Sequence, residues 1–163
     1  MNARDAIKSG IDTAQMCCSM YLQDMTDEEL MQRPHPDCNH INWQLGHLIQ
    51  SDHQMVSGVA PGKMPALPEG FAEKYARETA GSDDAGAFLK KDELLQLASE
   101  QLTAALAALA EFSDEDLDTP SPEEMQTYAP TAGAAFNMLG SHWMMHSGQW
   151  VVVRRQLGRP PLF

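Results

Sequence analysis

The spacing of apolar and polar residues along the chain predicts four long helices. In each one, apolar side chains recur at steps of three and four residues, which places them on one face of a helix. The first predicted helix, for example, carries Ile7, Ile11 and Leu22 on its apolar face. The four predicted helices cover residues 5–24, 39–58, 91–111 and 131–157. Because no segment shows the two-residue alternation typical of a strand, we expect an all-α fold.

Two short stretches suggest an internal repeat. The sequence TDEELMQRP (26–34) follows the first predicted helix, and SDEDLDTP (113–120) follows the third. Each begins with Ser or Thr and has an acidic residue three positions later, the pattern of a capping box on a helical turn. In both cases a proline-containing connection leads to a histidine-bearing helix. Two such helix pairs predict a single-domain four-helix bundle over residues 1–163.

The connection between the second and third predicted helices is long for a compact domain. It extends from about residue 59 to residue 90 and contains APGKMPALPEG, a run of helix-breaking residues. Long connections of this kind often act as functional lids or as crossovers between distant helix ends. The second helix itself is expected to begin at Asn39, as its N-cap, and to end near Gly58.

The charge and cysteine content narrow the classes of function. Eleven Lys and Arg against 23 Asp and Glu give a formal net charge of −12, which disfavours nucleic acid and anionic membrane surfaces as partners. No apolar run reaches the roughly 20 residues of a membrane span, and the N-terminus lacks the apolar region of a signal peptide. Cys17, Cys18 and Cys38 form no disulfide framework or metal motif. A cytoplasmic protein with free thiols is expected.

The stretch SHWMMHSGQW (141–150) contains the most informative chemistry. His142 and His146 are four residues apart, so both project from one face of the fourth predicted helix. That face is apolar, and buried imidazoles require partners because burying an unpaired polar group is costly. The spacing fits two ligands to one metal ion, although two hydrogen-bonded core histidines would also satisfy it. A third ligand would have to come from another helix.

The second predicted helix offers the candidates for that third ligand. His40 and His47 lie on the same side but about 10 Å apart along the axis, so both cannot reach one ion. His47 lies at mid-helix, where a bundle core is deepest, beside Gly46, which would let another helix approach closely. His53 points to a different side and is expected at the surface. Geometry therefore favours His47 and leaves His40 as the alternative.

Together these stretches resemble the DinB superfamily, including its YfiT-like members. The family pattern around its first histidine, W-x-L-G-H-L, is matched by Trp43, Leu45, Gly46, His47 and Leu48. The second pattern, H-x-x-x-H-x-G-Q, is matched by His142, His146, Gly148 and Gln149. The resemblance covers nearly the whole chain. It implies a four-helix bundle in which one histidine of the second helix and the H-x-x-x-H pair of the last bind a divalent metal. The implied ligands are His47, His142 and His146.

The identity of the metal and its supporting residues follow less directly. Imidazole ligands suit zinc, nickel, iron or copper, and three ligands leave positions open for water or substrate. Gln149 lies one turn beyond His146 and could support the ligands or simply fill the core. Asp52 lies among apolar positions and is a candidate partner or general base, unless the helix turns it towards solvent. The three tryptophans are interpreted as packing residues.

The resemblance implies an enzyme that acts on a small molecule. Some relatives activate a low-molecular-weight thiol, such as mycothiol or bacillithiol, for transfer or isomerisation, and others have been described as metal-dependent hydrolases. Hydrolysis needs a general base, for which Asp52 is the sole candidate, whereas thiol transfer needs only the metal and a pocket. A binding or stress-response module with a structural metal is the non-enzymatic alternative. Family members often form homodimers, which exposed apolar helix surface would permit here.

Overall fold

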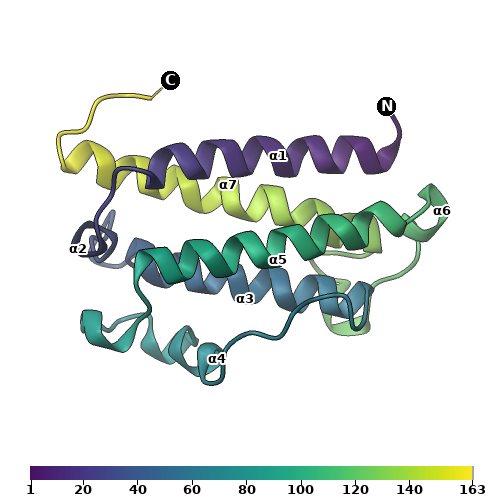
Figure 1. Cartoon of the computed structure of the whole chain (residues 1–163), viewed down its shortest axis with the longest axis horizontal. Coiled ribbons are helices and arrows are strands. Elements are labelled where there is room, and N and C mark those ends of the chain that lie inside the picture. Colours follow the sequence, from purple (N-terminus) through teal and green to yellow (C-terminus); the bar gives the residue numbers. More distant parts are fainter. Residues whose placement is uncertain (163) are drawn as a thin grey trace.

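Four long helices pack side by side and form the body of the protein (Figure 1). The computed structural model describes residues 1–162. The long helices are α1 (Ala3–Leu22), α3 (Ile41–Val59), α5 (Lys91–Glu111) and α7 (Ala132–Gln156). Single turns link them: α2 (Asp27–Leu30), α4 (Phe71–Lys74), α6 (Asp114–Leu117), and the 3₁₀ turns η1 (Arg77–Thr79), η2 (Ala85–Ala87) and η3 (Glu123–Met125). Residues 1–162 contain no β-strand, so the predicted all-α bundle is confirmed.

The direction of the helices explains the long connection. Helices α3 and α5 run in the same direction, opposite to α1 and α7 (Figure 1). The chain must therefore return along the whole bundle before α5 can begin. Helix α3 has 19 residues, so the return covers about 28 Å. Residues 60–90, which include α4, η1 and η2, make this crossover and lie along the side of α3.

Both predicted capping boxes are present at the single turns. The Thr26 hydroxyl accepts from the Glu29 N–H while the Glu29 carboxylate accepts from the Thr26 N–H. Ser113 and Asp116 make the same reciprocal pair at α6. These turns redirect the chain after α1 and after α5, which supports the predicted relationship between the two halves.

The start of α3 differs from the prediction. The N-cap is His40 rather than Asn39: the His40 Nδ1 atom accepts from the Trp43 backbone N–H at 3.0 Å. An imidazole nitrogen therefore does here what an asparagine side chain was expected to do. Helix α3 also continues one residue past Gly58, to Val59.

The hydrophobic core extends along the bundle, and α7 packs against both α1 and α3. Gly140 of α7 lies against the backbone of Gly10 in α1, where an added Cβ would come within 3.1 Å of the Gly10 carbonyl carbon and oxygen. Cys18 is buried as predicted, and burial raises the pKa of its thiol to about 12. Trp143 and Trp150 are buried core residues. None of the helices within residues 1–162 has both the length and the apolar content to cross a membrane.

Candidate metal centre

Helices α3 and α7 bring three histidines together. His47 projects from α3, and His142 and His146 project from α7 one turn apart. One ring nitrogen from each lies within 4.8 Å of those of the other two. The ring centroids are 5.1 Å apart for His47 and His142, 5.6 Å for His47 and His146, and 5.0 Å for His142 and His146. These three histidines are the metal ligands that the family resemblance implied.

The surroundings keep these imidazoles neutral. Burial, and secondarily the neighbouring histidines, lower the pKa of His142 and His146 to about 4. Burial also lowers the pKa of His47. At neutral pH each ring therefore has one nitrogen with a free lone pair, the form in which histidine binds a metal.

A glutamine that the sequence analysis overlooked fixes the orientation of His146. The Gln44 side-chain oxygen accepts from His146 Nδ1 at 3.0 Å and from Trp150 Nε1 at 2.8 Å. The Gln44 amide nitrogen donates to the Asn39 carbonyl and to Gln149 Oε1. With its amide fixed on both sides, Gln44 can only accept from the imidazole. The proton of His146 therefore lies on Nδ1, and Nε2 is left free.

The remaining atoms of the cluster fit a metal as well. His142 Nδ1 is buried and has no hydrogen-bond partner among the described residues. An orphaned buried nitrogen costs free energy unless something pairs with it. Three neutral imidazoles with one such atom form a donor set suited to a divalent transition metal.

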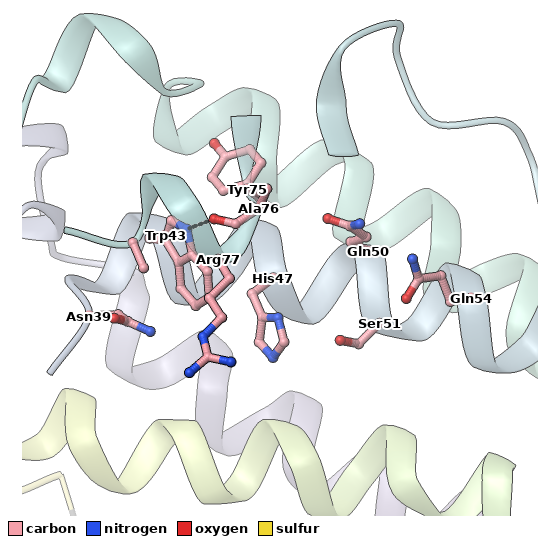
Figure 2. Close-up of a pocket in the computed structure, with 10 residues that line it drawn as sticks. Asn39, Trp43, His47, Gln50, Ser51, Gln54, Tyr75, Ala76 and Arg77 are labelled. Carbon is pink, nitrogen blue, oxygen red and sulfur yellow. Dashed lines mark hydrogen bonds between the residues drawn. The ribbon is translucent and has the colours of Figure 1, made fainter. Parts of the chain in front are cut away.

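A pocket opens beside the cluster, on the side of the crossover (Figure 2). Its volume is about 570 Å³, within the usual range for small-molecule sites. His47 belongs both to the cluster and to the pocket wall. Trp43 stacks on the His47 ring, with centroids 5.1 Å apart and planes 8° from parallel, and it also lines the pocket. The interpretation of Trp43 as a packing residue alone was therefore incomplete.

Comparison with known proteins agrees with the geometry. Residues 11–150 match the family model described as the DinB superfamily. The chain belongs to the DinB superfamily. No curated protein matches the sequence. Among solved structures, a conserved protein from Enterococcus faecalis is similar over 98% of this chain and 99% of its own, with a TM-score of 0.74 and 19% sequence identity. At that identity the likeness supports the fold alone.

The other histidines of this DinB-superfamily chain lie outside the cluster. His40, the alternative third ligand, is completely buried, with one nitrogen occupied in capping α3 and its ring 4.8 Å from that of Phe88. His53 is half-buried and lies outside the cluster, with its Nδ1 3.1 Å from Gln101 Oε1 of α5, so it is less exposed than a fully solvated surface residue. His35 lies exposed in the loop before α3.

Asp52 faces the core of the DinB bundle rather than solvent. Its carboxylate accepts from Trp143 Nε1 at 2.7 Å, and burial raises its pKa to about 8. Asp52 does not line the pocket beside His47. Gln149 is half-buried and supports Gln44, so its contact with the cluster is indirect.

Gly46 has the role of permitting close approach, but its neighbour is not a helix. An added Cβ at Gly46 would lie 2.1 Å from Tyr75 Cδ1. The Tyr75 ring, from the crossover, packs directly on α3 one residue before His47. Its hydroxyl donates to Asn42 Oδ1 and accepts from the Leu89 N–H.

Proposed function

We propose that the protein binds a divalent cation through His47, His142 and His146 and uses it in a reaction of a small molecule. The observation that carries this proposal is the position of His47, which is shared by the histidine cluster and the wall of the 570 Å³ pocket. A structural metal site is normally closed by four protein ligands. A three-histidine set beside a pocket leaves room for an exogenous ligand.

The chain's own residues prepare the site in distinct ways. Gln44 holds the proton of His146 on Nδ1, and Trp43 holds the plane of the His47 ring by stacking. The buried setting keeps all three rings neutral. A divalent cation bound there supplies Lewis acidity, which lowers the pKa of a thiol or of water towards neutrality. Zinc, nickel and iron are all compatible with the ligand set.

Thiol transfer is the reaction class that these residues support best. The thiol would come from a low-molecular-weight cofactor, because Cys17, Cys18 and Cys38 do not line the pocket. The Cys18 thiol is also buried, and burial raises its pKa to about 12. Thiol transfer needs no protein base. Hydrolysis would need one, and Asp52 bonds to Trp143 instead of facing the pocket. We therefore place thiol-dependent transfer or isomerisation ahead of metal-dependent hydrolysis.

The pocket also bears on the non-enzymatic alternative. A module that used a metal only to hold the bundle together would have no need of a cavity at its ligands. The cavity wall instead contains several polar side chains, among them Asn39, Ser51 and Gln54. These groups suit a bound polar molecule and favour an enzyme over a structural metal site.

The test is a transfer assay with reconstituted protein. Metal-free protein is loaded separately with zinc, nickel or iron and mixed with 1-chloro-2,4-dinitrobenzene and one of several thiols: cysteine, glutathione, coenzyme A, mycothiol or bacillithiol. In the reaction the thiolate sulfur bonds to the ring carbon and chloride leaves. At least one pair should react tenfold faster than with the His47→Ala variant. If no thiol reacts faster and an aryl ester is hydrolysed, the protein is a hydrolase; if neither reacts, the module interpretation replaces ours.

Location and assembly belong to the same proposal. Three free cysteines and the use of a small thiol suit a reducing cytoplasm.

Exposed apolar side chains on α1 and α7 would suit a homodimer; they are Met16, Met144, Met145 and Val152. Sedimentation equilibrium should give twice the 18.0 kDa chain mass, and a monomer mass at micromolar concentration would contradict the dimer.

A further inference from the structure

Arg77 is a charged side chain in the pocket wall without a protein partner. It is the first residue of η1 in the crossover, and its side chain is exposed. Within residues 1–162 its guanidinium makes no hydrogen bond and no ion pair. Figure 2 shows it reaching into the same open space as the His47 ring. A guanidinium offers five donors in a planar fork, and here all of them are available to a ligand.

The backbone that carries Arg77 is fixed to the metal-centre helix. Trp43 Nε1 donates to the carbonyl of Ala76, the preceding residue, at 3.2 Å and to Thr79 Oγ1 at 3.1 Å. Tyr75, the residue before Ala76, packs its ring against Gly46. The same Trp43 indole stacks on His47. One side chain therefore sets the positions of the metal-ligand candidate and of the segment that carries the guanidinium.

The charge of the pocket is unusual for this protein. The chain has a net charge of −12, yet none of the carboxylates within residues 1–162 lines the pocket. Apart from Arg77 and neutral His47, the polar side chains there are uncharged, and they include Asn39, Gln50, Ser51 and Gln54. A single positive charge thus determines which ligands the pocket favours. Glu73 and Glu78 flank the segment in sequence but do not line the pocket.

We propose that the pocket binds a small molecule with a carboxylate group, which pairs with the Arg77 guanidinium while the rest of the molecule extends towards His47. Arg and carboxylate match as two parallel N–H···O bonds, which add orientation as well as affinity. The proposal specifies the substrate class of the site described above. It rests on the proposed function only in one respect, namely which group of the bound molecule lies near His47 and reacts.

A carboxylate fits this wall better than a phosphate monoester. A phosphate monoester carries close to two negative charges at neutral pH and would meet one guanidinium and uncharged amides. A carboxylate carries one charge, which Arg77 neutralises by itself. The strongly acidic remainder of the protein adds to the repulsion of a dianion.

The first test uses cobalt-loaded protein and two thiols of equal length, 6-mercaptohexanoate and its neutral amide. Binding is followed by the thiolate-to-cobalt absorption band. The wild type should bind the carboxylate about tenfold more tightly than the amide. Arg77→Gln should remove this preference without changing the affinity for the amide or the cobalt stoichiometry. Arg155→Gln is the matched control, because it removes the same charge from an exposed position of α7 outside the pocket.

The second test is independent of the metal. Metal-free protein is titrated with hexanoate, hexanamide or methyl phosphate, and the Arg77 Nε–Hε signal is followed by NMR after assignment through its loss in Arg77→Gln. Hexanoate should shift this signal and hexanamide should not. The proposal is overturned if both shift it equally, if neither does, if methyl phosphate binds more tightly than hexanoate, or if Arg155→Gln removes the preference as Arg77→Gln does. If hexanoate shifts the Arg77 signal but no thiolate-to-cobalt band appears, the proposed thiol function is contradicted and the carboxylate proposal stands.

Discussion

His146 Nδ1 lies 3.0 Å from the side-chain oxygen of Gln44, a residue 102 positions earlier in the chain. Because the same oxygen also accepts from Trp150 and the amide nitrogen donates elsewhere, this hydrogen bond determines which nitrogen of His146 can bind a metal. A ligand held in one tautomer by a buried partner binds more tightly than one that must reorient on binding.

Replacing Gln44 should therefore weaken metal binding without removing a ligand. Gln44→Met keeps the approximate volume but leaves His146 Nδ1 without an acceptor. We expect the metal dissociation constant to rise roughly 10- to 100-fold, measured by competition with a chromogenic chelator. Gln54→Met, at an exposed position on the same helix, should bind like the wild type. Unchanged affinity in Gln44→Met would show that the glutamine does not support the site.

Trp43→Phe tests whether Trp43 holds the crossover in place. Phenylalanine keeps a ring for stacking on His47 but cannot donate to the Ala76 carbonyl, as Trp43 Nε1 does. Backbone amides of residues 76–80 should exchange with deuterium at least several-fold faster in the variant, measured by mass spectrometry. Metal stoichiometry should stay the same. Equal exchange in both proteins would mean that other contacts fix η1.

Gly46→Ala tests the close contact between α3 and the crossover. The added methyl group would overlap the Tyr75 ring, with 2.1 Å between Cβ and Cδ1. We expect a loss of about 1–3 kcal/mol in the free energy of unfolding by urea. Gly148→Ala is a suitable control on α7, since nothing lies within 4 Å of its added Cβ and alanine is the better helix former. Equal stability of Gly46→Ala and the wild type would show that Tyr75 moves aside freely.

The sequence was sufficient to predict the helices because their signals are local. Apolar spacing and capping residues determine α5 to the residue and α7 to within one residue at each end. The histidine cluster was also predictable, because His142 and His146 are neighbours on one helix and His47 lies near the middle of another. The family resemblance then favoured His47 over His40.

What the sequence analysis missed depends on contacts between distant segments. Gln44 interacts with His146, Trp150 and Gln149 from another helix, and nothing in its local spacing indicates this. A signal was present, however: Gln44 is, with Asn42 and His47, one of three polar residues in the mainly apolar run INWQLGHLI. Tyr75 and Arg77 lie in the irregular crossover, where no periodicity shows which side chains turn towards α3. The His40 cap was missed because Asn39 is the commoner capping residue.

The pH dependence of stability should show the cost of the buried titratable groups in metal-free protein. The pKa values of His40, His142 and His146 are lowered to about 4, so below about pH 6.5 the unfolded chain binds protons that the folded chain does not. Stability is lost as pH falls through this range. The pKa of Asp52 is raised to about 8, so its effect has the opposite sign, and stability is lost as pH rises towards 8.

Asp52→Asn separates the two effects. Asparagine can still accept from Trp143 Nε1 but does not titrate. Between about pH 6.5 and 8, the wild type should lose on the order of 1–2 kcal/mol from this group, while the variant should lose less. Urea unfolding at several pH values provides the measurement. A parallel decline in both proteins would place the titration on another group. Undiminished hydrolysis of an aryl ester by Asp52→Asn would also exclude Asp52 as a general base.

The central claim is most directly tested by the metal content of histidine variants. Each protein is stripped, incubated with zinc or nickel, passed through a desalting column and analysed by inductively coupled plasma mass spectrometry. We predict one ion per wild-type chain and less than a tenth of an ion in His47→Ala, His142→Ala and His146→Ala. His53→Ala should retain the full ion, and so should His40→Asn, which preserves a side-chain cap on α3. A wild type that binds no metal, or a His47→Ala variant that keeps its ion, would contradict the three-histidine site.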